Sequence, residues 1–494
     1  MNFTLEDIVR AVEGTAFLTD ADSADKSIKV SCAELDSRLV KEGGVFLAQK
    51  GEKVDGHSFI GKVWDMGAKL VITEKTPEEV EKEFGISAAG WGSYILVKDS
   101  LIALKQLGKA YREKLSIPIV GITGSVGKTS TKEFVAGVLS EKYNVFYTKG
   151  NFNNEIGVPL MLLKIREEHE AAVIEMGINH FGEMTRLSEM AQPDIAVITN
   201  IGYCHLEFLG DRDGVLKAKT EIFGNMNPNG EVCLFAGDDK LTTIKSVHGK
   251  AAYYFGPEAA GTGIKNSVTI VSEESMALKG SAVEFSLNMP AKGFEDTLIK
   301  AQVPLPGHHM VINAAAAANV AMLLGLSAEE IKAGIEQMGS IDGRNEIIVL
   351  KDMVMINDCY NANPVSMKSS IDLLKLADGA TAVILGDMFE LGKDEVQLHS
   401  EVGEYAVDSG IDYIYCVGEL SKNMYEGARE AFEKGGKTTR IMYFSDREHL
   451  IDGIREDFEA GQREMLPIGV NILVKASHGM HFEEVVKLLK ELDK

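Results

Sequence analysis

A glycine-rich turn joins an apolar run to a helix-forming segment about a quarter of the way along this chain. The apolar run covers residues 117–122, and the turn reads GITGSVGKTS over Gly121–Ser130. A strand, a tight glycine turn and a helix in this order let successive backbone amides face a phosphate group. Lys128 supplies a positive charge for the β and γ phosphates, and the Thr129 hydroxyl suits Mg²⁺. The sequence therefore predicts a mononucleotide-binding loop in an α/β fold.

The turn departs by one position from the strict phosphate-loop pattern. That pattern places glycine five residues before Gly127, where Ile122 stands, whereas Gly124 lies three residues before it. Because the turn still leads from a strand into a helix, we predict nucleotide binding rather than a chance glycine turn. The candidate contacts in this loop are Gly124, Ser125, Val126, Gly127, Lys128, Thr129 and Ser130.

The 494 residues allow roughly three domains, at about 150 residues each. We expect a small α/β N-terminal domain over residues 1–113, a central P-loop domain with a doubly wound sheet over residues 114–342, and a C-terminal Rossmann-like domain over residues 343–494. Period-two alternation between about residues 251 and 305 predicts an antiparallel appendage, followed by an alanine-rich helix from Asn313. Apolar runs predict strands at 44–48, 70–73, 171–176, 195–199, 353–357, 381–385, 413–417 and 471–475.

Charge and patterning exclude several classes of partner. Lys plus Arg number 51 against 74 Asp plus Glu, and a surface with a net charge of −23 repels polyanions, so we expect no nucleic-acid partner. The first residues carry acidic side chains and predict a helix capped by Thr4 and Asp7, not a signal peptide, and no run suggests a membrane span. Five scattered cysteines match neither a zinc site nor a disulfide scaffold. We expect a cytoplasmic monomer.

The phosphate loop and the segment Gly150–Gly157, GNFNNEIG, together resemble the Mur ligase family, whose members form amide bonds with ATP during peptidoglycan assembly. The resemblance implies an ATP-dependent ligase that joins D-alanyl-D-alanine to UDP-N-acetylmuramoyl-tripeptide through an acyl phosphate. Further fragments resemble the family in the same order along the chain, namely Glu175–His180, Thr199–Gly202 with His205, Lys217–Phe223, Gly343–Arg344, Asp358–Pro364 and Leu385–Gly392.

The resemblance implies roles for side chains around the reacting phosphate. It makes Lys128, Glu175, His205 and Lys219 catalytic, and it makes Thr129, Glu175, His205 and Lys219 the ligands of two Mg²⁺ ions. It also implies that CO₂ carbamylates Lys219, which turns a cation into an oxygen donor. From the residues alone, Glu175 follows a buried strand at the sheet edge where ligands of open α/β folds bind. His205 alone reads as a structural histidine, and Lys219 alone as a solvated helix charge.

Substrate contacts are likewise implied by the resemblance. For the UDP-linked substrate they are Ser37, Arg38, Asn151, Asn153 and Asn154, and for ATP beyond the loop they are Asn313, Arg344, Asp358 and Asn361. Arg344, at a hinge, would reach the γ phosphate, and Asp358 would accept hydrogen bonds from ribose hydroxyls. Without the resemblance, Asp36–Arg38 reads as a turn, and Arg344 and Asp358 read as ordinary ion-pairing residues.

The sequence departs from the family pattern at two places. Met310 stands where the family usually has an asparagine that contacts adenine, so we expect its thioether to pack on the purine face, with Asn313 as the remaining amide. Lys475-Ala476-Ser477-His478 stands where the family usually shows Lys-Gly-Ser-Arg, so the contact of that arginine is not carried over. The pair His478 and His481 reads as solvated or structural rather than metal-binding.

Two other functions fit parts of the pattern. A related ligase adds one amino acid to the dipeptide precursor and carries Asp-Asn-Pro-Arg, whereas this chain reads Asn361-Ala-Asn-Pro364-Val365. A phosphate-loop switch would bind nucleotide without ligating anything. A requirement for both the UDP-linked precursor and an amine in phosphate release would exclude the switch.

Overall fold

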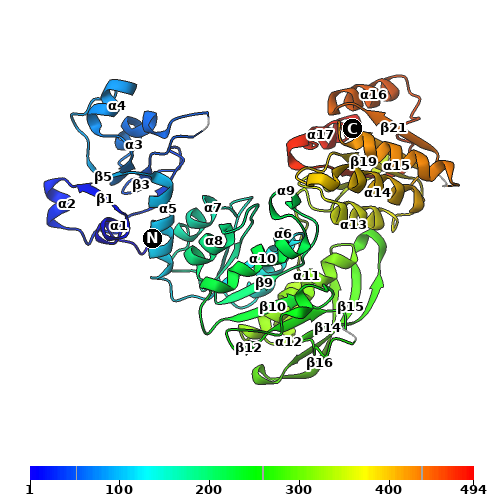
Figure 1. Ribbon diagram of the computed structural model, residues 1–494, viewed down its shortest axis with the longest axis horizontal. Helices are drawn as coiled ribbons and strands as arrows, with labels where there is room; N and C mark the ends of the chain where they lie inside the picture. Colours follow the sequence, from blue (N-terminus) through cyan, green and yellow to red (C-terminus); the bar gives the residue numbers. More distant parts are fainter. Residues whose placement is uncertain (52, 259–260, 436–437, 494) are drawn as a thin grey trace.

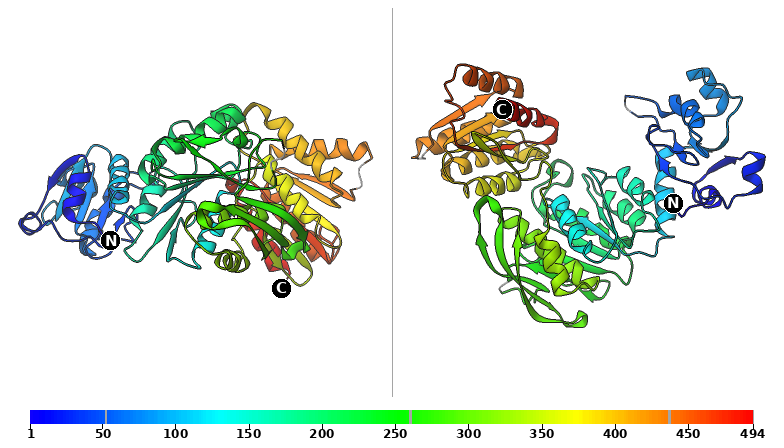
Figure 2. Two further views of the ribbon diagram at one scale, coloured as in Figure 1. Left: turned by 90° about the horizontal axis from the view of Figure 1, so that it is seen from below. Right: turned by 180° about the vertical axis from the view of Figure 1, so that it is seen from behind.

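The computed structural model describes residues 1–51, 53–258, 261–435 and 438–493. Its three main sheets have five, nine and six strands and follow one another along the chain. Figure 1 shows the N-terminal and C-terminal units at the two ends of an open V, with the central unit between them, and the views of Figure 2 agree. A ligand that contacts both outer units must therefore extend across the central unit.

The N-terminal unit is a five-stranded sheet of order β1-β5-β4-β3-β2, parallel except for β1. Thr4 caps the first helix and forms the predicted capping box with Asp7. The strands are β1 (Gly14–Phe17), β2 (Ala33–Glu34), β3 (Val45–Leu47), β4 (Leu70–Thr73) and β5 (Ser93–Val97). The helices are α1 (Leu5–Ala11), α2 (Asp20–Ala24), α3 (Ile60–Asp65), α4 (Pro77–Phe84) and α5 (Ser100–Arg112).

The central sheet has the order β16-β15-β14-β13-β10-β9-β6-β8-β7. The predicted antiparallel appendage is confirmed, because β15 pairs antiparallel with both β14 and β16. It extends the nucleotide-binding sheet, because β13 pairs in parallel with both β10 and β14. The strands are β6 (Ile119–Thr123), β7 (Val145–Tyr147), β8 (Ala171–Glu175), β9 (Ile195–Ile198), β10 (Glu231–Phe235), β13 (Tyr253–Gly256), β14 (Val268–Ser275), β15 (Ser281–Met289) and β16 (Phe294–Val303), with β11 (Ser246–Val247) and β12 (Lys250–Ala251) as a separate pair. The helices are α6 (Lys128–Leu139), α7 (Gly157–Leu163), α8 (Glu183–Ala191), α9 (Leu206–Leu209), α10 (Arg212–Thr220), α11 (His308–Leu323) and α12 (Ala328–Glu336).

The C-terminal sheet has the order β17-β18-β22-β19-β20-β21, with β17 antiparallel and the others parallel. Sequence patterning did not predict β17 or β21, whose residues are half-buried or exposed edge-strand residues without a continuous apolar run. The strands are β17 (Glu346–Val349), β18 (Met353–Asn357), β19 (Thr381–Gly386), β20 (Tyr413–Val417), β21 (Arg440–Phe444) and β22 (Val470–Lys475). The helices are α13 (Pro364–Leu374), α14 (Glu395–Asp408), α15 (Ser421–Glu433), α16 (Arg447–Glu459) and α17 (Glu483–Leu492).

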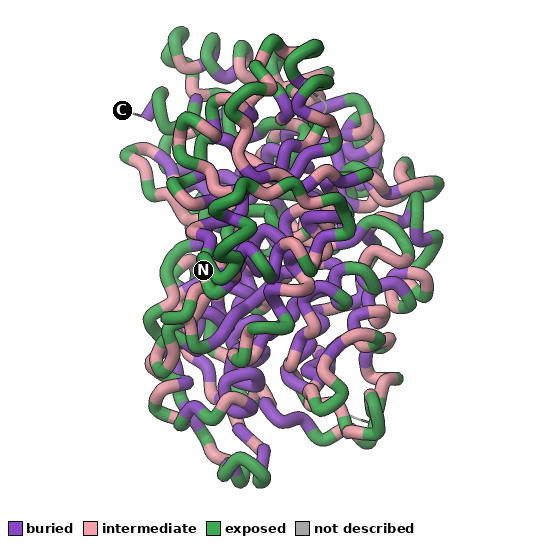
Figure 3. Tube along the Cα trace, turned by 90° about the vertical axis from the view of Figure 1, so that its left-hand side faces the viewer, coloured by how far each residue is buried: buried purple, intermediate pink, exposed green. Residues whose placement is uncertain are grey.

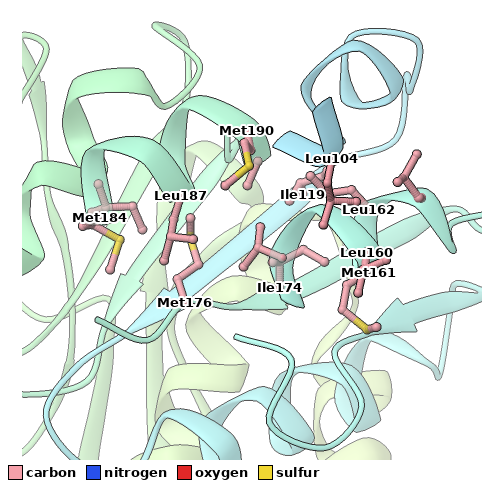
Figure 4. Packing of buried hydrophobic residues seen from close by; sticks show 14 of the residues in the cluster. Leu104, Ile119, Leu160, Met161, Leu162, Ile174, Met176, Met184, Leu187 and Met190 are labelled. Atoms are coloured by element: carbon pink, nitrogen blue, oxygen red, sulfur yellow. The ribbon is translucent and has the colours of Figure 1, made fainter. Parts of the chain in front are cut away.

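One hydrophobic core is shared by the N-terminal and central units. Figure 4 shows Leu104 of α5 beside Ile119 of β6 and Leu162 of α7, and the same cluster continues to Met190 and Met184 of α8. The other face of the central sheet is covered by α6 and α11, and the buried alanines of α11 lie in one core cluster with residues of β13–β16. Figure 3 shows these buried segments as a continuous interior. Helices therefore cover both faces of the central sheet. The phosphate loop lies at the carboxyl ends of its strands.

Among the described residues, no helix combines the length and apolar character that crossing a bilayer requires.

Candidate active site

A pocket lies between the central and C-terminal units, over the carboxyl ends of the central strands. The central unit contributes the phosphate loop, Thr199, Asn200 and the start of α11. The C-terminal unit contributes the two residues before β17, residues that follow β18, part of α13, and the last residue of β22. Arg344 and Thr129, which face each other across the pocket, lie 215 positions apart in the sequence. The lining includes Ser125, Val126, Gly127, Lys128, Thr129, Ser130, Asn313, Arg344, Asp358 and Asn361, all of which the sequence had marked as nucleotide contacts.

The phosphate loop takes its shape from two glycines with positive φ. Gly124 has φ 149° and Gly127 has φ 82°, and a Cβ on Gly124 would lie 1.9 Å from Thr199 Oγ1. The loop is fastened to the end of β9, because Asn200 Oδ1 accepts a hydrogen bond from the Val126 amide at 2.9 Å and Thr199 Oγ1 donates to the Val126 carbonyl at 2.6 Å. The loop is therefore held in place before any ligand binds.

Lys128 begins α6 and folds back over the loop. Its ammonium donates to the Gly124 carbonyl at 2.8 Å, and burial lowers its pKa below the ordinary lysine value. A loop carbonyl is a weak partner for a full charge, so the ammonium is available to a phosphate oxygen.

Glu175 ends β8 beside the loop, as the sequence predicts. Its Oε1 accepts hydrogen bonds from Thr129 Oγ1 at 3.2 Å and Asn153 Nδ2 at 2.8 Å. Its Oε2 is buried, has no hydrogen-bond partner among the residues that the structure describes, and lies 3.9 Å from Lys132 Nζ. A hydroxyl and a carboxylate side by side, with one buried oxygen unpaired, form a donor set that suits Mg²⁺. Thr129 and Glu175 therefore fit the first metal position that the family resemblance implies.

His205 and Lys219 lie near this cluster but are engaged differently. His205 Nδ1 lies 2.5 Å from Glu390 Oε2 of the C-terminal unit, so the histidine bridges the two units. Burial lowers the pKa of His205, against the opposing effect of Glu390, and the charges of Lys219 and Lys128 lower it further. Among the described residues, no group of three or more His, Cys, Asp or Glu side chains is arranged to hold a metal ion.

Lys219 is wholly buried in α10, which makes the interpretation as a solvated surface charge wrong. Its side chain is inaccessible, and its Nζ has no hydrogen-bond partner in the described part of the chain. Burial lowers the pKa of Lys219 to about 8, Cys204 opposes that effect and Lys128 adds to it. A buried amine with this pKa is partly neutral near physiological pH, as reaction with CO₂ requires.

The C-terminal wall is built around Asp358 at the end of β18. Asp358 forms a buried ion pair with Lys475 and accepts a hydrogen bond from Ser370 Oγ at 2.7 Å, while Lys475 also donates to the Asn361 carbonyl at 2.9 Å. Arg344 reaches across to the phosphate loop, where it donates to Thr129 Oγ1 at 3.2 Å, and its guanidinium stacks 3.9 Å from the Tyr360 ring. Arg344 therefore touches the loop where the γ phosphate is expected.

The structure corrects the prediction for Met310. This side chain is 1% exposed within the core beneath α11 and does not line the pocket, although its sulfur accepts a contact from Asn313 Nδ2 at 3.7 Å. Asn313 Oδ1 is occupied by a hydrogen bond from Thr131 Oγ1 at 2.9 Å. Apolar lining comes instead from Phe235, Phe255 and Ile312, which the sequence analysis did not single out.

His309, Asn345 and Lys475 also line the pocket without having been chosen from the sequence. Asn345 Nδ2 lies 2.8 Å from His309 Nε2, and burial lowers the pKa of His309 to about 4. Lys475 could have been found, because it ends a buried strand as Glu175 does. His309 and Asn345 come from opposite walls, and no local pattern would have paired them.

The residues implied for the UDP-linked substrate do not line this pocket. Ser37 is buried, while Arg38 is exposed and its guanidinium is held by Asp36, with hydrogen bonds of 2.7 to 3.1 Å. Asn154 accepts hydrogen bonds from Ile156 and Gly157 at the start of α7, whereas Asn151 is exposed. Only Asn153 of this set contacts the loop cluster, through Glu175.

The segment after β22 lacks an arginine, as the sequence showed. Ala476 is buried, and His478 and His481 are exposed with ring centroids 6.4 Å apart. His481 pairs with Glu483 at 3.1 Å. Neither histidine lines the pocket, although the His478 ring lies 5.7 Å from the ring of Tyr360, on which Arg344 stacks.

Three domain models of one protein family match the three units of this chain in succession. Family models described as "Mur ligase family, catalytic domain", "Mur ligase middle domain" and "Mur ligase, glutamate ligase domain" match residues 29–112, 122–321 and 343–466. The chain belongs to the Mur ligase family, and it has the three-domain α/β fold of that family.

Its full-length relatives include UDP-N-acetylmuramoyl-tripeptide–D-alanyl-D-alanine ligases, also called MurF. The ligase of that name from Bacillus subtilis (strain 168) is 34% identical over 99% of this chain and 98% of its own, and that from Escherichia coli (strain K12) is 33% identical over 94% of each. Among solved structures, MurF from Acinetobacter baumannii superposes with a TM-score of 0.83 at 30% identity over 99% of both chains. MurF ligase from Thermotoga maritima in complex with ADP has a TM-score of 0.76 at 26% identity over 93% of this chain and 97% of its own.

Proposed function

We propose that this chain uses ATP to join D-alanyl-D-alanine to UDP-N-acetylmuramoyl-tripeptide through an acyl phosphate. The observation that carries the proposal is the pocket in which the phosphate loop faces Arg344 and Asp358 of a second domain. A nucleotide in that pocket presents its terminal phosphate at the junction where further substrates can approach. The names of the full-length relatives supply the identity of those substrates.

The reaction requires two displacements. A carboxylate oxygen of the tripeptide attacks the γ phosphorus and ADP leaves, and the amine of D-alanyl-D-alanine then attacks the acyl carbon and phosphate leaves. Lys128 and Arg344 neutralise the charge that spreads over the transferred phosphoryl oxygens. Arg344 can contact the phosphoryl group only when the C-terminal unit lies against the central unit. The two units lie together in this way in the structure, because Arg344 donates a hydrogen bond to Thr129 at 3.2 Å. The chain thereby couples domain closure to phosphoryl transfer.

Two Mg²⁺ ions would supply Lewis-acid neutralisation of the phosphate oxygens. Thr129 and Glu175 would hold the first ion, as the unpaired oxygen of Glu175 indicates. We propose His205 and a carbamate on Lys219 for the second. The support is the buried Lys219 amine without a partner, which an added carboxylate-like group would turn into a ligand.

The N-terminal unit would bind the uridine part of the precursor through Ser37 and Arg38. Asn151, Asn153 and Asn154 of the central unit would contact the same substrate. We assign the domains to residues 1–113, 114–342 and 343–494. The five cysteines, which are free and buried, fit a reducing cytoplasm, where a monomer would act.

Isotope transfer tests the proposal. With heavy oxygen in the tripeptide carboxylate, released phosphate should carry the label, and its release should require both the UDP-linked tripeptide and D-alanyl-D-alanine. Single amino acids with the dipeptide precursor should not replace them. Unlabelled phosphate during productive ligation would exclude the acyl phosphate, and phosphate release without an amine would favour the nucleotide switch.

A further inference from the structure

Arg344 reaches the phosphate loop without a carboxylate to hold it. Its guanidinium donates a hydrogen bond to Thr129 Oγ1 at 3.2 Å, and no carboxylate pairs with it in the described part of the chain. Its Nε is buried and has no hydrogen-bond partner there either. An arginine side chain has many rotamers, so one hydrogen bond to a hydroxyl does not fix where its guanidinium lies. Another group must orient this side chain.

Tyr360 is the group that contacts the guanidinium. The centroid of its ring lies 3.9 Å from Arg344 Cζ. The face of an aromatic ring attracts a cation, but it neither neutralises the charge nor occupies the N–H groups, which stay free for phosphate oxygens. A carboxylate in the same place would do both. Tyr360 itself is half-buried and does not line the nucleotide pocket.

Tyr360 and Arg344 are neighbours because β17 and β18 pair antiparallel. The chain segments stay side by side beyond the ends of these strands, since the Asn345 amide donates to Asp358 Oδ1 at 3.3 Å. One step further, a methyl group placed on Gly343 would lie 3.8 Å from Tyr360 Cβ. The hairpin thus brings the ring to the base of the Arg344 side chain.

The Tyr360 ring also packs beside the segment after β22. The centroid of the His478 ring lies 5.7 Å from that of Tyr360, with the two planes tilted by 32°. His478 therefore belongs to a row of side chains, His478, Tyr360 and Arg344, that ends at the phosphate loop.

We propose that Tyr360 is a positioning residue, whose ring face holds the Arg344 guanidinium toward the γ phosphate. The inference rests on the proposed function and adds to it a residue outside the nucleotide pocket. Charge on the transferred phosphoryl oxygens spreads in the transition state, so an arginine that is held in place raises kcat more than it lowers KM for ATP. The ring performs this task, and the hydroxyl is dispensable.

Two substitutions separate the ring from the hydroxyl, with ligation-dependent phosphate release as the assay. Tyr360→Leu should lower kcat by about tenfold, the scale of a partly buried cation–π contact, while KM for ATP stays nearly unchanged. Tyr360→Phe should keep most of the wild-type kcat, because the ring remains. In Arg344→Met the change Tyr360→Leu should have no further effect, because the group that the ring positions is gone.

The matched control is Tyr425→Leu. Tyr425 of α15 has its ring centroid 5.9 Å from Arg429 Cζ and lies outside the pocket, so loss of this aromatic–arginine contact should leave kcat unchanged. Ring-current shifts of the Arg344 side-chain NMR signals, assigned with Arg344→Lys, test the contact without any substrate. They should disappear in Tyr360→Leu and persist in Tyr360→Phe.

The proposal is overturned if Tyr360→Leu keeps the wild-type kcat, if Tyr360→Phe loses as much as Tyr360→Leu, or if Tyr360→Leu slows Arg344→Met and the wild-type chain equally. Ring-current shifts that behave as expected in a chain that releases no phosphate with both substrates would instead count against the proposed function.

Discussion

Lys219 gives the sharpest test of the site's electrostatics. Its pKa falls from 10.5 to about 8 on folding because burial removes water from the ammonium. Between these values the unfolded chain binds more protons than the folded one, so the free energy of unfolding rises with pH across that window. Below pH 8 the folded chain carries the whole penalty. This lowering of the Lys219 pKa corresponds to a loss of at most about 3 kcal/mol in the free energy of unfolding.

Replacing Lys219 with methionine should therefore stabilise the chain at pH 7. Methionine fills similar volume and needs no partner. A gain of 1 kcal/mol raises the midpoint of thermal unfolding of a domain of this size by about 2–4 °C. Even a fraction of the maximum gain in stability is therefore measurable. Thermal unfolding would be followed in CO₂-depleted buffer without metal or nucleotide, from pH 7 to 10.5. The gain over wild type should shrink as pH rises.

The control is Lys217→Met in the same helix, where the side chain is exposed and lies 5.4 Å from the Phe181 ring. It should change stability by no more than about 0.5 kcal/mol. The reasoning is refuted if Lys219→Met is less stable than wild type at pH 7, or if its difference from wild type does not vary with pH.

Three further outcomes follow from the site. Lys128→Met should lower kcat by about 10²–10³, measured as ligation-dependent phosphate release, and an unchanged rate would remove it from the mechanism. Met310→Asn should leave the ratio of kcat/KM for ATP and GTP unchanged, because the side chain lies in the core, and should lower stability by about 1–3 kcal/mol through an unpaired buried amide; a changed ratio would place this residue at the base. Lys475→Met should destabilise the chain by about 3–5 kcal/mol, because Asp358 stays buried without its cation, and adding Asp358→Asn should recover part of the loss. Equal melting of the single and double variants would contradict that explanation.

Local patterns predicted the fold where burial is continuous. β18 and β20 match their apolar runs, because parallel strands covered on both faces leave no position for polar residues. The edge strands β17 and β21 carry mixed residues, so periodicity could not distinguish them from loops. The extension of the central sheet by β14–β16 depended on the pairing of β13, which no sequence window contains.

The candidate site shows the same division. Residues that one loop or one strand end supplies, such as Lys128 and Glu175, were found from the sequence. From the second unit, Arg344 and Asp358 were found only through the family resemblance, and the contact of His309 with Asn345 was not found at all. The predicted contact of Met310 with the purine was wrong because the family pattern gives only the residue type at this position. The packing of α11 decides whether that side chain lies in the core or in the pocket.

One wall of the nucleotide pocket belongs to the central unit, and the other wall belongs to the C-terminal unit. The hydrogen bond from Thr131 to Asn313 ties α6 to α11 beneath the phosphates, whereas Arg344 and Glu390 reach the central unit from outside it. We expect ADP to leave when these outer contacts separate. We therefore expect the slow step of each turnover to be an opening motion on the microsecond-to-millisecond scale, so that solvent viscosity, more than the strength of the phosphate contacts, sets how fast successive precursors are completed.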